Sequence, residues 1–336
     1  MFSKKTVFFL GAGAGHDYNM PLGKGLKDSI ASKLKADPDE LWPTLVNPLG
    51  LASHENAHSY REIKQLIASN MDKAESIDNF LHTHSENPTL VTVGKVAIAA
   101  CILDAERYSN MMPVVPRETD AYIFSFRSET ENWLSRFCTM AFTGLVASDA
   151  HTAFNNVTIV TFNYDRCIEQ YIVGHIESYL GISERAAQDI VSSLNIIHVY
   201  GKVGKLPWQS GPEPDIPFGK KPAPEQLLVV SQGIRTFTER VEEDDTQQRI
   251  EAKLAEAEIV VFSGFSFGSS NWEFLQNSTP GPRKMAIAGM MGISSPNQVN
   301  IQNRLTSYLH PAADVYIEPY DGGCLELLYD YSSYFE

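Results

Sequence analysis

The sequence has few cysteines and no basic cluster. Its four cysteines, Cys101, Cys138, Cys167 and Cys324, lie far apart, and no two of them form a Cys-x-x-Cys pair. This spacing provides neither a zinc motif nor a dense disulfide framework, so we expect no metal and a reducing environment. The net charge of −14 and the lack of a long Lys/Arg run argue against nucleic acid or an anionic membrane as the main partner.

Targeting and membrane signals are missing as well. Only a few residues precede the first apolar stretch, too few for the apolar region of a secretory leader. We also expect no segment of membrane-spanning length, and therefore a cytoplasmic protein. The 336 residues suffice for one large α/β domain or two smaller ones with a sizeable core.

Short apolar runs separated by helical patterns predict the fold class. The runs expected to form strands are 7–10, 157–162, 196–200, 227–230, 259–262 and 284–288. Helical spacing is found instead at 60–67, 77–82, 91–108 and 130–146. Buried strands that alternate with helices predict a Rossmann-like parallel sheet covered by helices on both faces. We expect this core in residues 1–24 and 151–336, with an all-helical subdomain of residues 25–150 inserted into it.

The first strand runs directly into Gly11-Ala12-Gly13-Ala14-Gly15. Glycines this dense let backbone N–H groups approach a phosphate, although the same stretch could be only a tight strand-to-helix turn. His16 stands where the dinucleotide fingerprint of dehydrogenases requires its third glycine, and no acidic residue closes a second strand about twenty residues on. No Gly-Lys-Ser/Thr follows, which excludes a P-loop. The loop can still bind a nucleotide, but neither as a dehydrogenase fingerprint nor as a P-loop.

Three later strand ends also carry polar or glycine residues. They are Thr161-Phe162-Asn163-Tyr164-Asp165, His198-Val199-Tyr200-Gly201 and Gly264-Phe265-Ser266-Phe267. The carboxyl ends of parallel strands share one edge, so these segments should converge on one crevice. Each has a structural alternative: Asn163 could cap a helix, His198 could be a satisfied core histidine, and Gly264-Phe265-Ser266 could be a plain turn.

The order and spacing of these motifs, with Met20-Pro21-Leu22-Gly23 after the first loop, resemble the sirtuin-like family. The similarity is to the bacterial branch that lacks the zinc module and carries a helical insertion, and it covers roughly residues 5–320. The resemblance implies that NAD+ is the substrate, hydrolysed to nicotinamide and ADP-ribose, and that the protein defends against phage by depleting NAD. By this resemblance the residues that would bind NAD+ are Gly11, Ala12, Gly13, Ala14, Gly15, Pro21, Leu22, Asn163, Asp165, Gly264, Phe265 and Ser266.

Cleavage of the N-glycosidic bond passes through an oxocarbenium-like state, which an amide or carboxylate near C1′ can stabilise. We expect Asn163 to position water and Asp165 to hold the nicotinamide amide or support the site. The family's catalytic histidine precedes the glycine that ends the third strand, but Tyr200 stands there in this chain. Strand alternation would place His198 on the same face as Tyr200, one pleat deeper.

Three outcomes stay open at this position. Tyr200 could orient the reactants, His198 could substitute through a water, or the protein could bind NAD without efficient turnover. The last outcome corresponds to a sensor of NAD or ADP-ribose, or to an assembly module for a partner such as an ATPase or a nuclease-like effector. We expect a homo-oligomer, and the sequence does not separate hydrolysis from cyclisation or ADP-ribosyl transfer.

Overall fold

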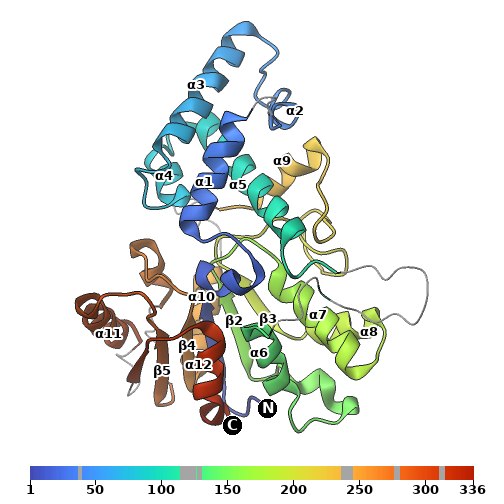
Figure 1. Cartoon of the computed structure of the whole chain (residues 1–336), viewed down its shortest axis with the longest axis vertical. Helices are drawn as coiled ribbons and strands as arrows, with labels where there is room; N and C mark the ends of the chain where they lie inside the picture. Colours follow the sequence, from blue (N-terminus) through green and yellow to red (C-terminus); the bar gives the residue numbers. More distant parts are fainter. Residues whose placement is uncertain (37–39, 114–125, 127–130, 236–244, 276–280, 310–314) are drawn as a thin grey trace.

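The computed structural model contains a six-stranded, all-parallel sheet flanked by helices on both faces, a Rossmann-like α/β fold (Figure 1). The structure describes residues 1–36, 40–113, 126, 131–235, 245–275, 281–309 and 315–336. The strands are β1 (Thr6–Leu10), β2 (Val157–Thr161), β3 (Asn195–His198), β4 (Ile259–Ser263), β5 (Lys284–Gly289) and β6 (Val315–Tyr320).

The strand order is β3-β2-β1-β4-β5-β6, so the direction of winding reverses between β1 and β4. In a sheet of this order the ligand crevice lies at that reversal, outside the carboxyl ends of the strands. Leu10 pairs with Thr161 on one side and with Ser263 on the other, and Thr161 pairs with His198. The segments that follow these four strand ends therefore start side by side.

The central strands form because their sequences are continuous apolar runs. Every residue of β1, β2 and β4 is buried, as expected for parallel strands covered on both faces. Neighbouring strands pack through aromatic contacts such as Phe9 on Phe262, whose ring centroids are 5.1 Å apart. The sheet core is thus a rigid base beneath the strand ends.

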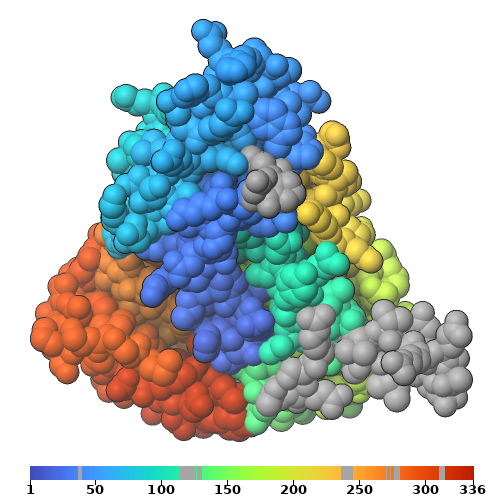
Figure 2. All heavy atoms as spheres, turned by 45° about the horizontal axis from the view of Figure 1, so that its top comes forward, coloured from blue at the N-terminus to red at the C-terminus, as the bar shows by residue number. Residues whose placement is uncertain are grey.

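The helices divide into two groups (Figure 1). Those standing over the carboxyl-terminal edge of the sheet are α1 (Gly23–Lys35), α2 (Trp42–Leu45), α3 (His54–Asn70), α4 (Ile77–Thr83), α5 (Pro88–Tyr108) and α9 (Pro224–Gln232). Those flanking the sheet are α6 (Trp133–Phe142), α7 (Cys167–Leu180), α8 (Glu184–Val191), α10 (Thr246–Glu256), α11 (Ser295–Leu309) and α12 (Cys324–Asp330). Figure 2 shows the blue and teal atoms of the first group beside the orange and red atoms of α11 and α12.

The first group of helices is built around α5. Asn87 caps this helix by accepting a hydrogen bond from Leu90 N (3.0 Å), and Pro88 occupies its first position. Helices α1, α3, α4 and α9 all pack on α5, whereas α6 packs on α7 and α12. The division into a core and a helical subdomain of residues 25–150 stays a prediction. Helix α6 lies within 25–150 but packs on α7 and α12 of the expected core, and α9 lies outside that range but packs on α5.

Helix α5 corrects one expectation. Its 21 residues contain an 18-residue window with a mean hydropathy of 1.6, long and apolar enough to cross a membrane, although we expected no segment of that length. The structure buries 56% of the relevant window, which is compatible with the core helix of a soluble protein.

One strand prediction was wrong, another extended two residues too far, and one strand was missed. Residues 227–230 lie inside α9, because Pro224 starts a helix there and Gln226 accepts a hydrogen bond from Ala223 N (3.1 Å). The strand expected at 196–200 ends at His198, where the chain turns. The missed strand is β6, whose Glu318 and Pro319 interrupt an apolar pattern in the way edge strands tolerate.

Among the expected helices, 60–67, 77–82 and 91–108 lie within α3, α4 and α5. The helix expected at 130–146 is shorter, and forms α6. Thr130, where we expected it to begin, lies outside the described residues.

Candidate functional site

The segments that follow β1, β2, β3 and β4 contact one another at the sheet edge. Asn163 Nδ2 donates a hydrogen bond to Gly11 O (3.1 Å), and His198 Nδ1 lies 3.1 Å from Asn163 O. On the other side, Gly13 N donates to Gly264 O (2.9 Å). The structure therefore brings together residues from all four strand ends, at the reversal of the sheet where Rossmann-like folds bind ligands.

The glycines of the first loop are required by backbone packing. A Cβ on Gly13 would lie 2.7 Å from Gly264 Cα, and one on Gly264 would collide with Ala14 N. Gly264 also adopts a φ of +59°, which favours glycine. Within the loop, Gly11 N donates to Ser263 O (3.3 Å) and Ala14 N to Gly11 O (3.0 Å). In this conformation, amides that we expected to face a phosphate bind other backbone atoms.

The rest of this loop, Ala12–Tyr18, forms a 3₁₀ helix. Its Ala14 O accepts a hydrogen bond from Trp133 Nε1 (2.7 Å), and its Gly15 O accepts one from Met20 N (3.0 Å). Ala12 and Gly13 are half-buried, whereas Ala14 and Gly15 are buried and His16 and Asp17 are exposed.

Pro21 and Leu22, which lead into α1, lie elsewhere. Leu22 is exposed, and Pro21 lines a cavity of about 620 Å³ between α1 and α5. Lys33 Nζ and Asp104 Oδ2 lie 2.6 Å apart in this cavity between α1 and α5. Neither Pro21 nor Leu22 lines the cavity beside Ser266, in the segment after β4.

Asp165 lies one residue before Arg166, the N-cap of the helix that follows β2. Its Oδ1 accepts a hydrogen bond from Cys167 N (3.0 Å), the first residue of α7, so Asp165, not Asn163, binds the start of this helix. Asn163 is instead half-buried and directed at the loop after β1. Burial, reinforced by the nearby charge of Glu106, raises the pKa of Asp165 to about 6. Asp165 is thus a carboxyl group that changes protonation near neutral pH.

His198 is held by two oxygen atoms. Its Nδ1 faces Asn163 O and its Nε2 faces Glu169 Oε1, both at 3.1 Å. Burial would raise the pKa of Glu169, but the charge and hydrogen bond of His198, with Lys202, outweigh it and keep that pKa at about 2. The ring of His198 thus joins β3 to the segment after β2 through Asn163 and to α7 through Glu169.

Tyr200 is buried among aromatic rings. Its hydroxyl donates a hydrogen bond to Asn271 Oδ1 (2.7 Å), and its ring contacts Phe162 (centroids 5.9 Å apart) and Phe274 (6.5 Å). Phe265 packs on Phe162 at 4.9 Å. Because β3 ends at His198, the strand alternation that related His198 to Tyr200 does not apply.

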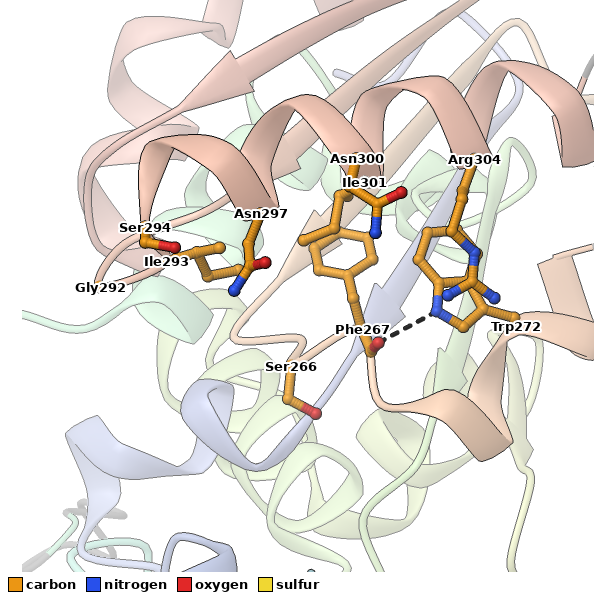
Figure 3. A pocket seen from close by; sticks show the side chains of 10 residues that line it. All are labelled: Ser266, Phe267, Trp272, Gly292, Ile293, Ser294, Asn297, Asn300, Ile301 and Arg304. Atoms are coloured by element: carbon orange, nitrogen blue, oxygen red, sulfur yellow. Dashed lines mark hydrogen bonds between the residues drawn. The ribbon is translucent and has the colours of Figure 1, made fainter.

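A cavity of about 500 Å³ adjoins these strand ends (Figure 3). Exposed Ser266 lines it from the segment after β4, and α11 closes the opposite side. Asn297, Asn300 and Arg304 project into it from one face of α11. The predicted residues Asn163, Asp165, His198 and Tyr200 line neither this cavity nor the one between α1 and α5.

The sequence analysis missed the α11 residues and Trp272, which also lines this cavity. The available signal was the spacing of Asn297, Asn300 and Arg304 by three and four residues, which places polar side chains on one helical face.

Two further missed contacts join the helical group to the strand ends. The fully buried Arg166 binds Glu106 of α5, with its N and Nε 2.9 and 3.1 Å from Glu106 Oε1. Tyr164 donates a hydrogen bond from its hydroxyl to Asp78 of α4. These pairs fix the helices over the crevice.

Among the residues that the structure describes, no group of three or more His, Cys, Asp or Glu side chains is arranged as a metal site. The chain matches no protein-family model, and no curated protein is significantly similar to it.

Proposed function

We propose that the protein is an NAD+ hydrolase whose crevice lies at the β1/β4 reversal of the sheet. The observation that carries this proposal is the position of Asn163, whose amide nitrogen is bound to Gly11 O beside the packed Gly13–Gly264 pair. Its nitrogen is used in this contact, so its Oδ1 is the atom available to accept a hydrogen bond from a water molecule. This is the role that an amide near the reacting carbon requires.

The proposed reaction needs little acid or base assistance. The bond between ribose C1′ and the nicotinamide nitrogen breaks, and its electron pair leaves with neutral nicotinamide. A water oxygen then bonds to C1′ and releases one proton, which gives ADP-ribose. Asn163 orients that water, and Asp165, with a pKa of about 6, supports the amide end of the leaving group or takes up the proton. A histidine at position 200 is therefore not essential to the chemistry.

A second candidate function is a sensor that binds NAD+ or ADP-ribose without efficient turnover. The hydrogen bond of Tyr200 to Asn271 and its burial among aromatic rings favour this alternative, because they close the position of the family's histidine. A homo-oligomer, or a complex with an ATPase or a nuclease-like effector, would fit either function.

Mass spectrometry of NAD+ incubated with the protein tests the hydrolase. We expect nicotinamide and ADP-ribose from the wild type, and a loss of at least about a hundredfold in Asn163→Ala. The matched control is Asn156→Ala, because Asn156 binds the carbonyls of Phe2 and Ser3 (3.1 Å each) outside the crevice. Equal product formation by wild type and Asn163→Ala would refute the assignment, and a cyclic product would replace hydrolysis by cyclisation.

Tyr200→His separates the two candidate functions. A large gain in nicotinamide release would identify the wild type as a disabled site and favour the sensor. Unchanged release at a high wild-type rate would favour the hydrolase. The role in phage defence predicts a fall of cellular NAD+ on infection that Asn163→Ala prevents.

A further inference from the structure

The cavity between the segment after β4 and α11 has an unusual charge. Arg304 is the one charged side chain among the described residues that line it, and none of those residues is acidic. The other polar groups are hydroxyls and amides, among them Ser266, Asn297 and Asn300. The cavity thus carries a positive charge in a protein whose net charge is −14.

Arg304 is oriented by stacking. Its guanidinium carbon lies 3.8 Å from the centroid of the Trp272 ring, and Trp272 Nε1 is itself bound to Phe267 O (3.1 Å). Figure 3 shows Arg304 extending from α11 onto this ring. Its contacts within the described residues are with the rings of Trp272 and Tyr308, without a carboxylate. A stacked guanidinium keeps its in-plane N–H donors for a planar or tetrahedral anion.

The absence of an acidic residue among the described residues of the lining bears on whether the ligand is NAD+ or its 2′-phosphorylated form, NADP+. In dinucleotide-binding Rossmann folds a carboxylate on the adenosine ribose favours NAD+, whereas a nearby arginine accommodates the 2′-phosphate of NADP+; this chain lacks the sequence fingerprint of those folds, but the same charge rule applies to any site for the two ligands. A carboxylate would repel that phosphate, and here the lining offers an arginine instead. Ser266, at the near end of the cavity, belongs to the same segment as Gly264, whose carbonyl accepts a hydrogen bond from Gly13 N (2.9 Å), so the cavity adjoins the strand ends of the proposed crevice.

We propose that this cavity binds the 2′-phosphorylated adenosine end of NADP+, with Arg304 as the residue that selects the 2′-phosphate. Asn297 and Asn300 supply hydrogen bonds to the adenosine. The inference rests on the proposed function in that it assumes the nicotinamide end lies at Asn163.

The test compares 2′-phospho-ADP-ribose with ADP-ribose by isothermal titration calorimetry. The two ligands differ only in the 2′-phosphate, and neither requires turnover. We expect the wild type to bind 2′-phospho-ADP-ribose at least about tenfold more tightly. Arg304→Met keeps an aliphatic chain on Trp272 and should abolish this preference, while Arg304→Lys should retain part of it. ADP-ribose affinity should change less than about threefold in both variants.

Equal affinity of the wild type for the two ligands, or a preference that survives in Arg304→Met, would overturn the inference. A tight 2′-phospho-ADP-ribose complex without hydrolysis of NAD+ or NADP+ would overturn the proposed hydrolase and leave the inference standing. Hydrolysis of NAD+ without a 2′-phosphate preference would overturn the inference alone. Binding of neither ligand would overturn both.

Discussion

Asp165→Asn should stabilise the protein while impairing its proposed activity. Asp165 is buried, and its pKa rises from the usual 3.8 to about 6. Asparagine retains an oxygen that can accept the hydrogen bond from Cys167 N, now 3.0 Å from Asp165 Oδ1. The substitution therefore removes the buried charge but keeps the hydrogen bond to the first residue of α7.

The pKa shift sets the size of the effect. A shift of about two units corresponds to roughly 3 kcal/mol of destabilisation by ionised Asp165. Because the folded pKa is raised, the native state binds a proton between pH 4 and 6 that the unfolded state lacks, so this contribution weakens the fold as pH rises. We expect Asp165→Asn to raise the free energy of unfolding by about 1–3 kcal/mol at pH 7.5, and the difference to shrink towards pH 4.5.

Urea unfolding at pH 7.5, 6.0 and 4.5 measures this difference, with nicotinamide release followed on the same samples. The matched control is Asp28→Asn on the exposed face of α1, for which we expect a free energy of unfolding within about 0.5 kcal/mol of wild type. A variant less stable than wild type at pH 7.5, or a stability gain that does not shrink on acidification, would refute the argument. Greater stability with lower nicotinamide release is the expected result, a trade-off typical of functional sites.

Three further substitutions test the frame around the crevice by chemical denaturation. Glu106→Gln leaves the Arg166 charge buried without its carboxylate partner and should lower the free energy of unfolding by about 3–5 kcal/mol. The control, Glu256→Gln in the exposed pair with Lys5, should lower it by less than about 1 kcal/mol, and similar losses in the two variants would show that burial of the pair does not matter. Gly264→Ala should lower the free energy of unfolding by at least about 2 kcal/mol more than Gly292→Ala, because both glycines have a positive φ but only a Cβ at 264 would collide with another backbone segment. Equal losses would disprove the close approach of Gly264 to the loop after β1. Glu169→Gln should lower stability at pH 7 by roughly 2–3 kcal/mol, because the native pKa is held at about 2. That deficit should disappear as pH falls from about 4.5 towards 2, and a deficit constant with pH would contradict the ion pair with His198.

The sheet could be predicted where its strands are buried on both faces. The runs at 7–10 and 259–262 are continuously apolar and lie within β1 and β4, so pattern and environment agree. Residues 227–230 have the same composition but lie in α9, because a short apolar run does not distinguish a strand from a buried helix. Strand β6 escaped prediction because an edge strand admits Glu318 and Pro319.

The convergence of the strand-end segments was predictable, but their individual contacts were not. Parallel topology alone implies that the segments after β1, β2 and β4 share an edge, and Asn163 indeed reaches Gly11. The partner of Tyr200, Asn271, and the arginine of the adjoining cavity come from segments 71 and more residues away. Their positions depend on how the β4 and β5 connections fold back, which no local pattern specifies.

The most direct test of the proposed crevice is hydrogen–deuterium exchange with and without saturating ADP-ribose. The account predicts slower exchange in peptides covering 11–15, 162–165 and 264–267, because the ligand would contact all three strand ends. Unchanged exchange in these peptides, or protection confined to the cavity between α1 and α5, would contradict it.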